Sequence, residues 1–478
     1  MEESLKEKAF IGVSWSVIEK FSVQGTNFLL QIILARLLMP ADFGLIAIIL
    51  VFIQISQVII DSGFASALIQ KKKCIEEDYT TVFYCNLIIS LVIYFILFFT
   101  APLIAKIYNE VELISLLRVI SVSLLFNALS IVQRTKLVKN VDFKSISIYS
   151  FLSSVSSGGI SIVAAYSGAG VWALVLQVLL NSLFLFLLFW IKTKWIPSFS
   201  FSIRSFNSLF KFGSNLLLTN LLNTLYRNLY SMIIGKKYNS ADLGCYSRAD
   251  QFAMFPSNNL SLIILRVAYP VLSRIQDDDK RLRGAYVELL KYSSFIIFPL
   301  MLGLAAVAEP FIIAILTEKW IFVVPLLQIL CFDWMFDHMS AINLNVLYVK
   351  NHTGWALNIE IIKKIIAILI LIITIPFGVV VMCWGRVLYS IFAVIINGYF
   401  TNKLIGLSLF SQILDILPYF VGSLCMAGLV LVINTLDFSP IIQLSVSFIV
   451  GVSFYSLLSF LFFRPILLSL YKFYFLRK

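Results

Sequence analysis

Basic side chains lie inside several long apolar runs of this sequence, where a charge is costly unless it meets a partner or a hydrated cavity. They are Lys20, Arg118, Arg227, Arg248, Arg266, Lys291, Lys363, Lys364 and Arg386. A guanidinium can bind phosphate oxygens through two parallel hydrogen bonds, so this set is typical of a site for an anionic ligand. We rank Arg227 and Arg248 first as ligand-binding residues, and Arg386 and Lys364 second. Arg118 and Arg266 are weaker candidates, because they lie near run ends where long side chains reach water.

Acidic side chains in the apolar runs are the second candidate set. Asp333 and Asp337 are four residues apart, beside His338, which would place both carboxylates on one helix face. Such a pair could share a proton or hold Na⁺, or each member could pair with a base from a neighbouring helix. Asp250 follows Arg248 by two residues, so it points away from Arg248 and is predicted to pair across helices. We predict Asp333, Asp337 and Asp250 as ion-coupling residues.

Some charged residues are spaced so that they can form an ion pair with a residue of the same helix. Lys363 and Lys364 follow Glu360 by three and four residues, so Glu360 can neutralise one of the two. Lys291 follows Glu288 by three residues, and a pair on the helix surface is expected there.

Sequence signatures of several enzyme classes are absent. No C-x-x-C pair and no G-x-x-x-x-G-K-[ST] motif occurs in the sequence, so neither a zinc site nor ATP hydrolysis is predicted. The run Asp277-Asp278-Asp279 precedes Lys280 in a short loop and is predicted to be a solvated charge cluster. We therefore predict no catalytic residues, no metal site and no cofactor apart from a coupling ion, H⁺ or Na⁺. The protein is not expected to be an enzyme.

The composition identifies the elements that carry these residues. Hydrophobic residues make up 60% of the 478-residue chain and charged residues 13%, against about 25% in soluble domains. The predicted fold class is an all-α polytopic membrane protein with about 14 transmembrane helices. The expected spans are 10–36, 41–61, 80–104, 112–134, 146–166, 170–192, 209–234, 241–270, 288–316, 322–348, 354–376, 378–402, 412–433 and 441–465.

The distribution of Lys and Arg predicts the orientation. With the N-terminus inside, the cytoplasmic loops collect roughly 23 of the basic residues. The outer loops keep Arg36, Lys106, Lys236, Lys237 and Lys319. This bias predicts that both termini are cytoplasmic, and it attributes the net charge of +12 to cytoplasmic loops rather than to nucleic-acid binding. The acidic N-terminus does not resemble a signal peptide.

Two short segments recur about 200 residues apart. Ala41-Asp42-Phe43-Gly44 returns as Ala241-Asp242-Leu243-Gly244, and Ala101-Pro102-Leu103-Ile104 is echoed by Glu309-Pro310-Phe311-Ile312. The offset is six helices, so the repeats are predicted to be parallel, with their axis along the membrane normal. We predict two six-helix lobes, 1–206 and 207–405, around a central cleft, followed by two additional helices and a basic tail in 406–478.

The opening motifs resemble those of a known family. They are Gly12-x-x-Trp15, Leu34-Ala35-Arg36-Leu37-Leu38-x-Pro40-x-Asp42-Phe43-Gly44 and Asp61-x-Gly63-x-x-x-Ala67-Leu68-Ile69-Gln70. Further matches are Gly170-Val171-Trp172, Leu243-Gly244-x-Tyr246-Ser247-Arg248 and Pro270-x-Leu272-Ser273-Arg274. Together they resemble the Wzx-type polysaccharide flippases of the multidrug/oligosaccharidyl-lipid/polysaccharide exporter superfamily, most closely the colanic-acid and teichuronic-acid exporter subgroup. Beyond about residue 350 the similarity is only hydropathic.

The resemblance implies a function and a location. It implies outward flipping of an undecaprenyl-diphosphate-linked oligosaccharide across the bacterial inner membrane by alternating access, for surface polysaccharide synthesis. The implied partners are the lipid-linked oligosaccharide, the bilayer, and the polymerase and chain-length proteins of the same pathway. Members often carry an acid three positions after the arginine matching Arg227, but here that position is Tyr230. An ion-coupling role of that acidic residue in the family therefore cannot be assigned to Tyr230 of this sequence.

Two other functions are compatible with the sequence. A drug or metabolite antiporter of the same superfamily would favour an acidic or aromatic cavity, whereas intramembrane bases slightly outnumber acids here. A membrane-embedded polysaccharide polymerase or ligase would need a sizeable outer loop, and the predicted outer loops are short.

Asp61 is predicted to have a structural role at a helix end.

Overall fold

The structure is a computed structural model that describes residues 22–468, and every regular element in that range is a helix. Contacts divide the chain into two units, Met1–Gly244 and Cys245–Lys478, which are described separately. The predicted motif residues Gly12 and Trp15 and the candidate Lys20 lie outside the described residues.

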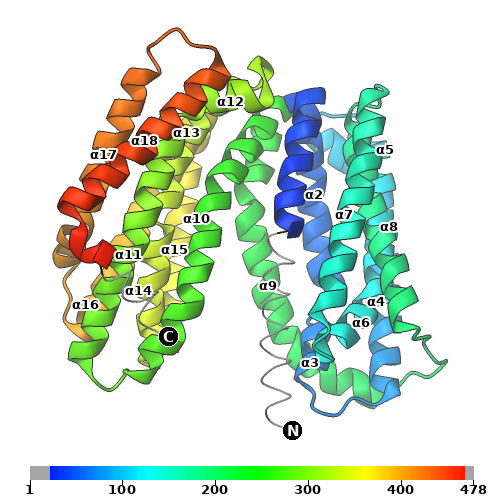
Figure 1. The fold of residues 1–478 in the computed structure, drawn as a ribbon. Helices are drawn as coiled ribbons and strands as arrows, with labels where there is room; N and C mark the ends of the chain where they lie inside the picture. Colours follow the sequence, from blue (N-terminus) through cyan, green and yellow to red (C-terminus); the bar gives the residue numbers. More distant parts are fainter. Residues whose placement is uncertain (1–21, 469–478) are drawn as a thin grey trace. The chain divides into compact units, whose positions relative to one another are not determined.

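Unit 1 is built from long helices joined by short turns (Figure 1). Residues 22–37 are helical. They are followed by α2 (Pro40–Asp61), α3 (Phe64–Gln70), α4 (Glu76–Tyr108), α5 (Leu113–Ile120), α6 (Val122–Lys139), α7 (Phe143–Tyr166), α8 (Val171–Thr193) and α9 (Ile203–Lys237). The helix α10 (Ser240–Arg274) begins in unit 1 and continues in unit 2.

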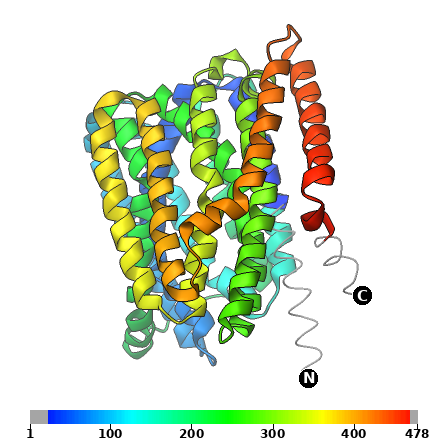
Figure 2. The same cartoon turned by 90° about the vertical axis from the view of Figure 1, so that its left-hand side faces the viewer.

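Unit 2 contains the rest of α10 and a second set of helices. These are α11 (Asp279–Ala306), α12 (Ala308–Leu316), α13 (Val323–Met335), α14 (Asp337–Val349), α15 (Thr353–Thr374), α16 (Val379–Ile405), α17 (Leu409–Ile433) and α18 (Pro440–Phe462), with short 3₁₀ turns at Glu318–Trp320 and Ile375–Phe377. Figure 2 shows α15 beside α16, and α17 beside α18.

Both repeat segments begin a helix, and each start has a side-chain to backbone hydrogen bond in its first turn. At the start of α2, Pro40 occupies the first turn and the Asp42 carboxylate accepts a hydrogen bond of 2.9 Å from the Met39 N–H. At the start of α10, the side-chain oxygen of Asn239 accepts a hydrogen bond of 2.7 Å from the Asp242 N–H. Both arrangements satisfy backbone donors that a helix start leaves unpaired.

The prediction of an all-helical membrane protein is confirmed. Within residues 22–468, nine helices are long and apolar enough to span a membrane. They are Pro40–Gln70, Glu76–Tyr108, Leu113–Lys139, Phe143–Tyr166, Val171–Thr193, Asp279–Ala306, Val379–Ile405, Leu409–Ile433 and Pro440–Phe462. The total of about 14 spans and the two-lobe division at residue 206 stay predictions.

Helix α9, which the repeat assigns to the second half, packs in unit 1 against α2, α3 and α4. Gly63 has a left-handed φ of 71°, and a Cβ added to it would lie 2.6 Å from the Gly213 carbonyl oxygen on α9. The Phe64 ring beside it packs between Phe206 and Phe210 of α9. Glycines at 63 and 213 therefore allow the two backbones to come close enough for this contact.

Candidate functional site

Three charged side chains predicted from the sequence come together inside unit 2. Asp250 lies on α10, Asp333 on α13 and Arg386 on α16, and we call these three residues the charge cluster. Arg386 Nη1 lies 2.7 Å from Asp250 Oδ1, and Arg386 Nη2 lies 2.6 Å from Asp333 Oδ2. One guanidinium thus binds two carboxylates from two other helices. The prediction that Asp250 pairs across helices is confirmed.

Neighbouring polar groups complete the hydrogen bonding of the charge cluster. Arg386 Nη1 also donates to the Tyr246 hydroxyl at 2.7 Å, and Trp334 Nε1–H donates to Asp250 Oδ1 at 2.9 Å. The Ser390 hydroxyl donates to Asp333 Oδ1. Tyr246 precedes Asp250 by four residues, and Ser390 follows Arg386 by four. Each pair therefore lies on one face of its helix and points at the same centre.

The charge cluster is short of positive charge. Its side chains are 28% exposed at Asp250, 8% at Asp333 and 15% at Arg386. With all three ionised, the net charge is −1. An uncompensated charge is expensive in a low-dielectric interior, whereas one added proton makes the cluster neutral. The arrangement therefore holds two carboxylates from two helices on one guanidinium.

The other predicted ligand-binding residues have different surroundings. Arg118 donates from Nε to the Phe98 carbonyl oxygen at 3.2 Å and stacks over the Phe98 ring at 4.2 Å, which fixes α5 against α4. Arg227 on α9 and Arg266 on α10 are exposed. Arg248 on α10 and Lys364 on α15 are half-buried.

The remaining local predictions have mixed outcomes. Lys363 forms the predicted ion pair with Glu360. The predicted pair of Lys291 with Glu288 is wrong among the described residues, because Lys291 Nζ lies 2.8 Å from Asp415 Oδ1 on α17. At the end of α2, the Asp61 carboxylate accepts a hydrogen bond of 3.3 Å from the Ala65 N–H, as expected for a structural role.

Asp333 and Asp337 are not on one continuous helix. Helix α13 ends at Met335 and α14 begins at Asp337. Between them the Phe336 N–H bonds to the Asp333 carbonyl oxygen at 3.4 Å, a tightened turn. Asp337 is half-buried at the start of α14.

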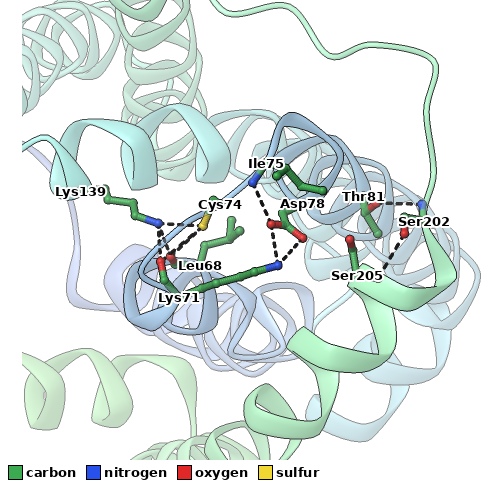
Figure 3. A network of polar contacts seen from close by, with 9 residues as sticks. All are labelled: Leu68, Lys71, Cys74, Ile75, Asp78, Thr81, Lys139, Ser202 and Ser205. Carbon is green, nitrogen blue, oxygen red and sulfur yellow. Dashed lines mark hydrogen bonds and ion pairs between the residues drawn. The ribbon is translucent and has the colours of Figure 1, made fainter.

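A second polar network lies in unit 1 at the turn between α3 and α4 (Figure 3). Lys71 Nζ lies 2.7 Å from Asp78 Oδ2, and the same carboxylate oxygen accepts from the Ile75 N–H at 3.0 Å. Lys139, at the end of α6, donates to the carbonyl oxygens of Leu68 at 3.0 Å and Lys71 at 2.6 Å. We call these five residues the turn network. Its contacts connect the basic loop before α4 to α4 itself and to the end of α6.

The start of α9 is attached to the same region. The Thr81 hydroxyl on α4 accepts from the Ser202 N–H at 3.1 Å, and the Ser202 hydroxyl caps α9 by accepting from the Ser205 N–H at 3.2 Å (Figure 3). Glu76 at the start of α4 accepts from Trp195 Nε1–H at 2.6 Å and pairs with Lys136 at 3.1 Å. The connector from α8 to α9 is therefore fixed along α4.

Three residues of the site, Tyr246, Trp334 and Ser390, are not predicted from the sequence. The i, i+4 spacing of Tyr246 to Asp250 and of Ser390 to Arg386 is a signal that could have found two of them. Trp334 adjoins Asp333 in sequence but bonds the other aspartate, so only the structure reveals its role.

The arrangement of intramembrane charges in a helical bundle fits a transporter, and comparison with known proteins decides the family. Residues 33–325 match the model of a family described as "Polysaccharide biosynthesis protein". The chain belongs to this family. The match confirms the predicted kinship with a family of polysaccharide biosynthesis proteins.

Several relatives are named for polysaccharide synthesis. This family member is 29% identical over 304 residues to the teichuronic acid biosynthesis protein TuaB of Bacillus subtilis (strain 168), covering 63% of each chain. That is slightly under two thirds of TuaB's own length. It is 29% identical over 330 residues to the lipopolysaccharide biosynthesis protein WzxC of Escherichia coli (strain K12), covering 69% of this chain and 67% of WzxC. The succinoglycan biosynthesis transport protein ExoT of Rhizobium meliloti (strain 1021) is 27% identical over 318 residues, covering 66% of this chain and 64% of ExoT.

Solved structures share the fold of this family member. The lipid II flippase MurJ in an inward closed conformation superposes with a TM-score of 0.75 at 17% identity, covering 95% of this chain and all of MurJ. An inward-facing multidrug MATE transporter superposes with a TM-score of 0.62 at 13% identity, covering 81% of this chain and 98% of the transporter. These similarities establish the fold.

Proposed function

We propose that this protein flips undecaprenyl-diphosphate-linked oligosaccharide repeat units from the cytoplasmic to the outer leaflet by alternating access, driven by proton exchange. The single observation that supports the coupling is the charge cluster, in which one guanidinium, that of Arg386, binds two carboxylates, those of Asp250 and Asp333. Family membership and the names of the relatives support the cargo.

The cargo sets the physical problem. Its lipid tail can stay in hydrocarbon, but its diphosphate and sugars need a hydrated route past the apolar core. We propose that Arg227, Arg248, Arg266 and Lys364 contact the diphosphate, because guanidinium and ammonium groups complement its charge. Arg386 has a different role in this proposal, because its two Nη groups already bind carboxylates.

A proton suits the charge cluster better than Na⁺ does. Na⁺ would need several oxygen ligands, and the Arg386 guanidinium lies between the two carboxylates that would supply them. A proton on one carboxylate leaves the other ion pair in place and removes the net charge. Proton uptake and release can thus change how tightly α10, α13 and α16 are held together, which gives the coupling a structural effect.

A deletion in the native host tests the function. We expect the lipid-linked repeat unit to accumulate on the cytoplasmic face and surface polysaccharide to be lost. The wild-type gene should restore export, and Asp250→Asn should not. The matched control is Asp278→Asn, which removes an exposed carboxylate that lies in the loop before α11.

Two results would contradict the proposal. Unchanged surface polysaccharide in the deletion strain, with new sensitivity to cationic dyes, would favour a drug antiporter. Export that is restored by Asp250→Asn as fully as by Asp278→Asn would remove the coupling role of the charge cluster while leaving the cargo in place.

A further inference from the structure

Polar side chains, most of them buried, lie beyond the charge cluster on α14 and α16 of unit 2 and on the neighbouring α11 and α17. They are His338, Ser340, Asn343, Asn397, Tyr286 and Gln412, and we call them the polar track. Five of them are at most 1% exposed, and Ser340 is half-buried. Neutral polar groups buried this fully among apolar helices are costly unless they bond to one another or to water.

Three separate sets of hydrogen bonds involve the residues of the polar track. His338 Nε2 lies 3.0 Å from the Ser294 hydroxyl on α11. Asn397 Nδ2 on α16 donates to the Ser340 hydroxyl on α14 at 3.1 Å. The Tyr286 hydroxyl on α11 lies 2.9 Å from the side-chain oxygens of both Asn343 and Gln412, so its one proton is shared between the two acceptors.

The three sets follow one another along the helices. His338 and Asn343 are five residues apart on α14, which is about 7.5 Å along the helix axis, and Asp333 precedes them near the end of α13. The last set lies near the end of unit 2 where α14 ends at Val349 and α17 begins at Leu409. The basic loops predict that this end is cytoplasmic.

Two atoms of the polar track, the Asn397 side-chain oxygen and His338 Nδ1, have no hydrogen-bond partner among residues 22–468. Asn397 is fully buried. A buried acceptor of this kind is normally bonded to an ordered water. Water at Asn397 would lie between the charge cluster and Tyr286, where hydrogen bonds between side chains do not continue along the polar track.

We propose that the polar track is the path by which the charge cluster releases its proton to the cytoplasm. This rests on the proposed proton coupling and adds the route and its side. The O–H bond of the protonated carboxyl breaks, a water beside it takes the proton, and the carboxylate regains its full charge next to Arg386. The proton then moves through water and hydroxyl groups to the solvent at the cytoplasmic end.

The groups that face the charge cluster are compatible with this step. Tyr246 from α10 and Cys383 from α16 interact electrostatically with Arg386, as do Asp250 and Asp333. His338 lies on the track itself, where its ring is hydrogen-bonded to the Ser294 hydroxyl. The competing explanation is that these polar residues only hold the helices together, as interhelical hydrogen bonds do in many membrane proteins.

Infrared spectroscopy of the full-length protein in lipid bilayers separates the two explanations. The carboxylic-acid band, assigned by its loss in Asp333→Asn or Asp250→Asn, shifts when its proton exchanges with D₂O. We expect Tyr286→Phe and Asn397→Leu to slow this exchange about tenfold, the effect of raising a barrier by the net value of one hydrogen bond.

Matched controls lie in the same unit. Tyr455→Phe removes a buried hydroxyl that bonds the Phe295 carbonyl oxygen at 3.0 Å, and Asn434→Leu removes an amide that bonds Ser447 at 2.8 Å. Both should leave exchange unchanged. Equal exchange in track and control variants would overturn the path while leaving proton coupling intact. A wild-type protein that shows no carboxylic-acid band between acid and neutral pH would overturn both.

Discussion

Gly44 and Gly244 occupy the same position in the two repeats, and each packs against the start of the other's helix. A Cβ added to Gly44 would lie 1.7 Å from the Ser240 carbonyl oxygen, and one added to Gly244 would lie 1.9 Å from the Pro40 carbonyl oxygen. Real Cβ atoms do not come this close to backbone atoms. The repeated glycine is therefore required by a reciprocal contact of α2 with the first turn of α10, all of it within unit 1.

Replacing either glycine should destabilise the protein. We expect Gly44→Ala or Gly244→Ala to cost about 1–3 kcal/mol, because the added methyl group must push two backbones apart. Thermal unfolding in detergent measures the effect. Gly284→Ala is the control, because nothing lies within 4 Å of its added Cβ on α11, and it should be neutral or stabilising. If the Gly244→Ala protein had the same melting temperature as the Gly284→Ala protein, this result would contradict the contact.

Removing Arg386 should be more harmful than removing one of its partners. Arg386→Met leaves one buried carboxylate, that of Asp333, and one half-buried carboxylate, that of Asp250, without their shared cation, and we expect a loss of about 3–5 kcal/mol. The double variant Arg386→Met/Asp333→Asn should recover part of this loss, because only one carboxylate then remains. Folded yield after size-exclusion chromatography and melting temperature measure both. If the double variant has no higher folded yield or melting temperature than Arg386→Met, Arg386 and Asp333 are not energetically coupled as their distance implies.

The charge cluster was only partly predictable from the sequence. Asp250, Asp333 and Arg386 were each found because charges inside apolar runs are rare. Their meeting was not predictable, because it depends on how α10, α13 and α16 pack. Spacing along one helix gave the Lys363–Glu360 pair correctly, but it failed for Lys291, whose partner comes from α17.

The fold shows the same difference between local and long-range information. Helix starts at Pro40 and Ser240 follow from capping residues that the sequence displays. The packing of α9 against α2 could not be predicted from the repeat, because the repeat places α9 in the other half. The close approach of Gly63 to Gly213 depends on two glycines 150 residues apart, each of which alone reads as an ordinary loop or helix residue.

The turn network should protect its basic loop from proteolysis. Lys139→Met removes the ammonium that bonds the carbonyl oxygens of Leu68 and Lys71, so we expect faster trypsin cleavage at the adjacent exposed Lys72 and Lys73. Membrane vesicles that expose this side, analysed by mass spectrometry, provide the measurement. Lys211→Met removes an exposed lysine of α9 and serves as the control. Identical cleavage in both variants would mean that the network does not order the loop.

The ion pair between Lys291 on α11 and Asp415 on α17 should help to attach α17 to the rest of unit 2. Their side chains are 32% and 27% exposed, so solvent screening is partial and we expect Lys291→Met to cost about 1 kcal/mol. The exchanged variant Lys291→Asp/Asp415→Lys restores opposite charges and should regain most of the lost stability, whereas Lys291→Asp alone places two carboxylates together and should be the least stable. Melting temperatures at low and high salt measure this order. Since salt screens the interaction, the differences should shrink as ionic strength rises. An exchanged variant as unstable as Lys291→Asp would show that packing around Lys291, and not its charge, holds α17 in place.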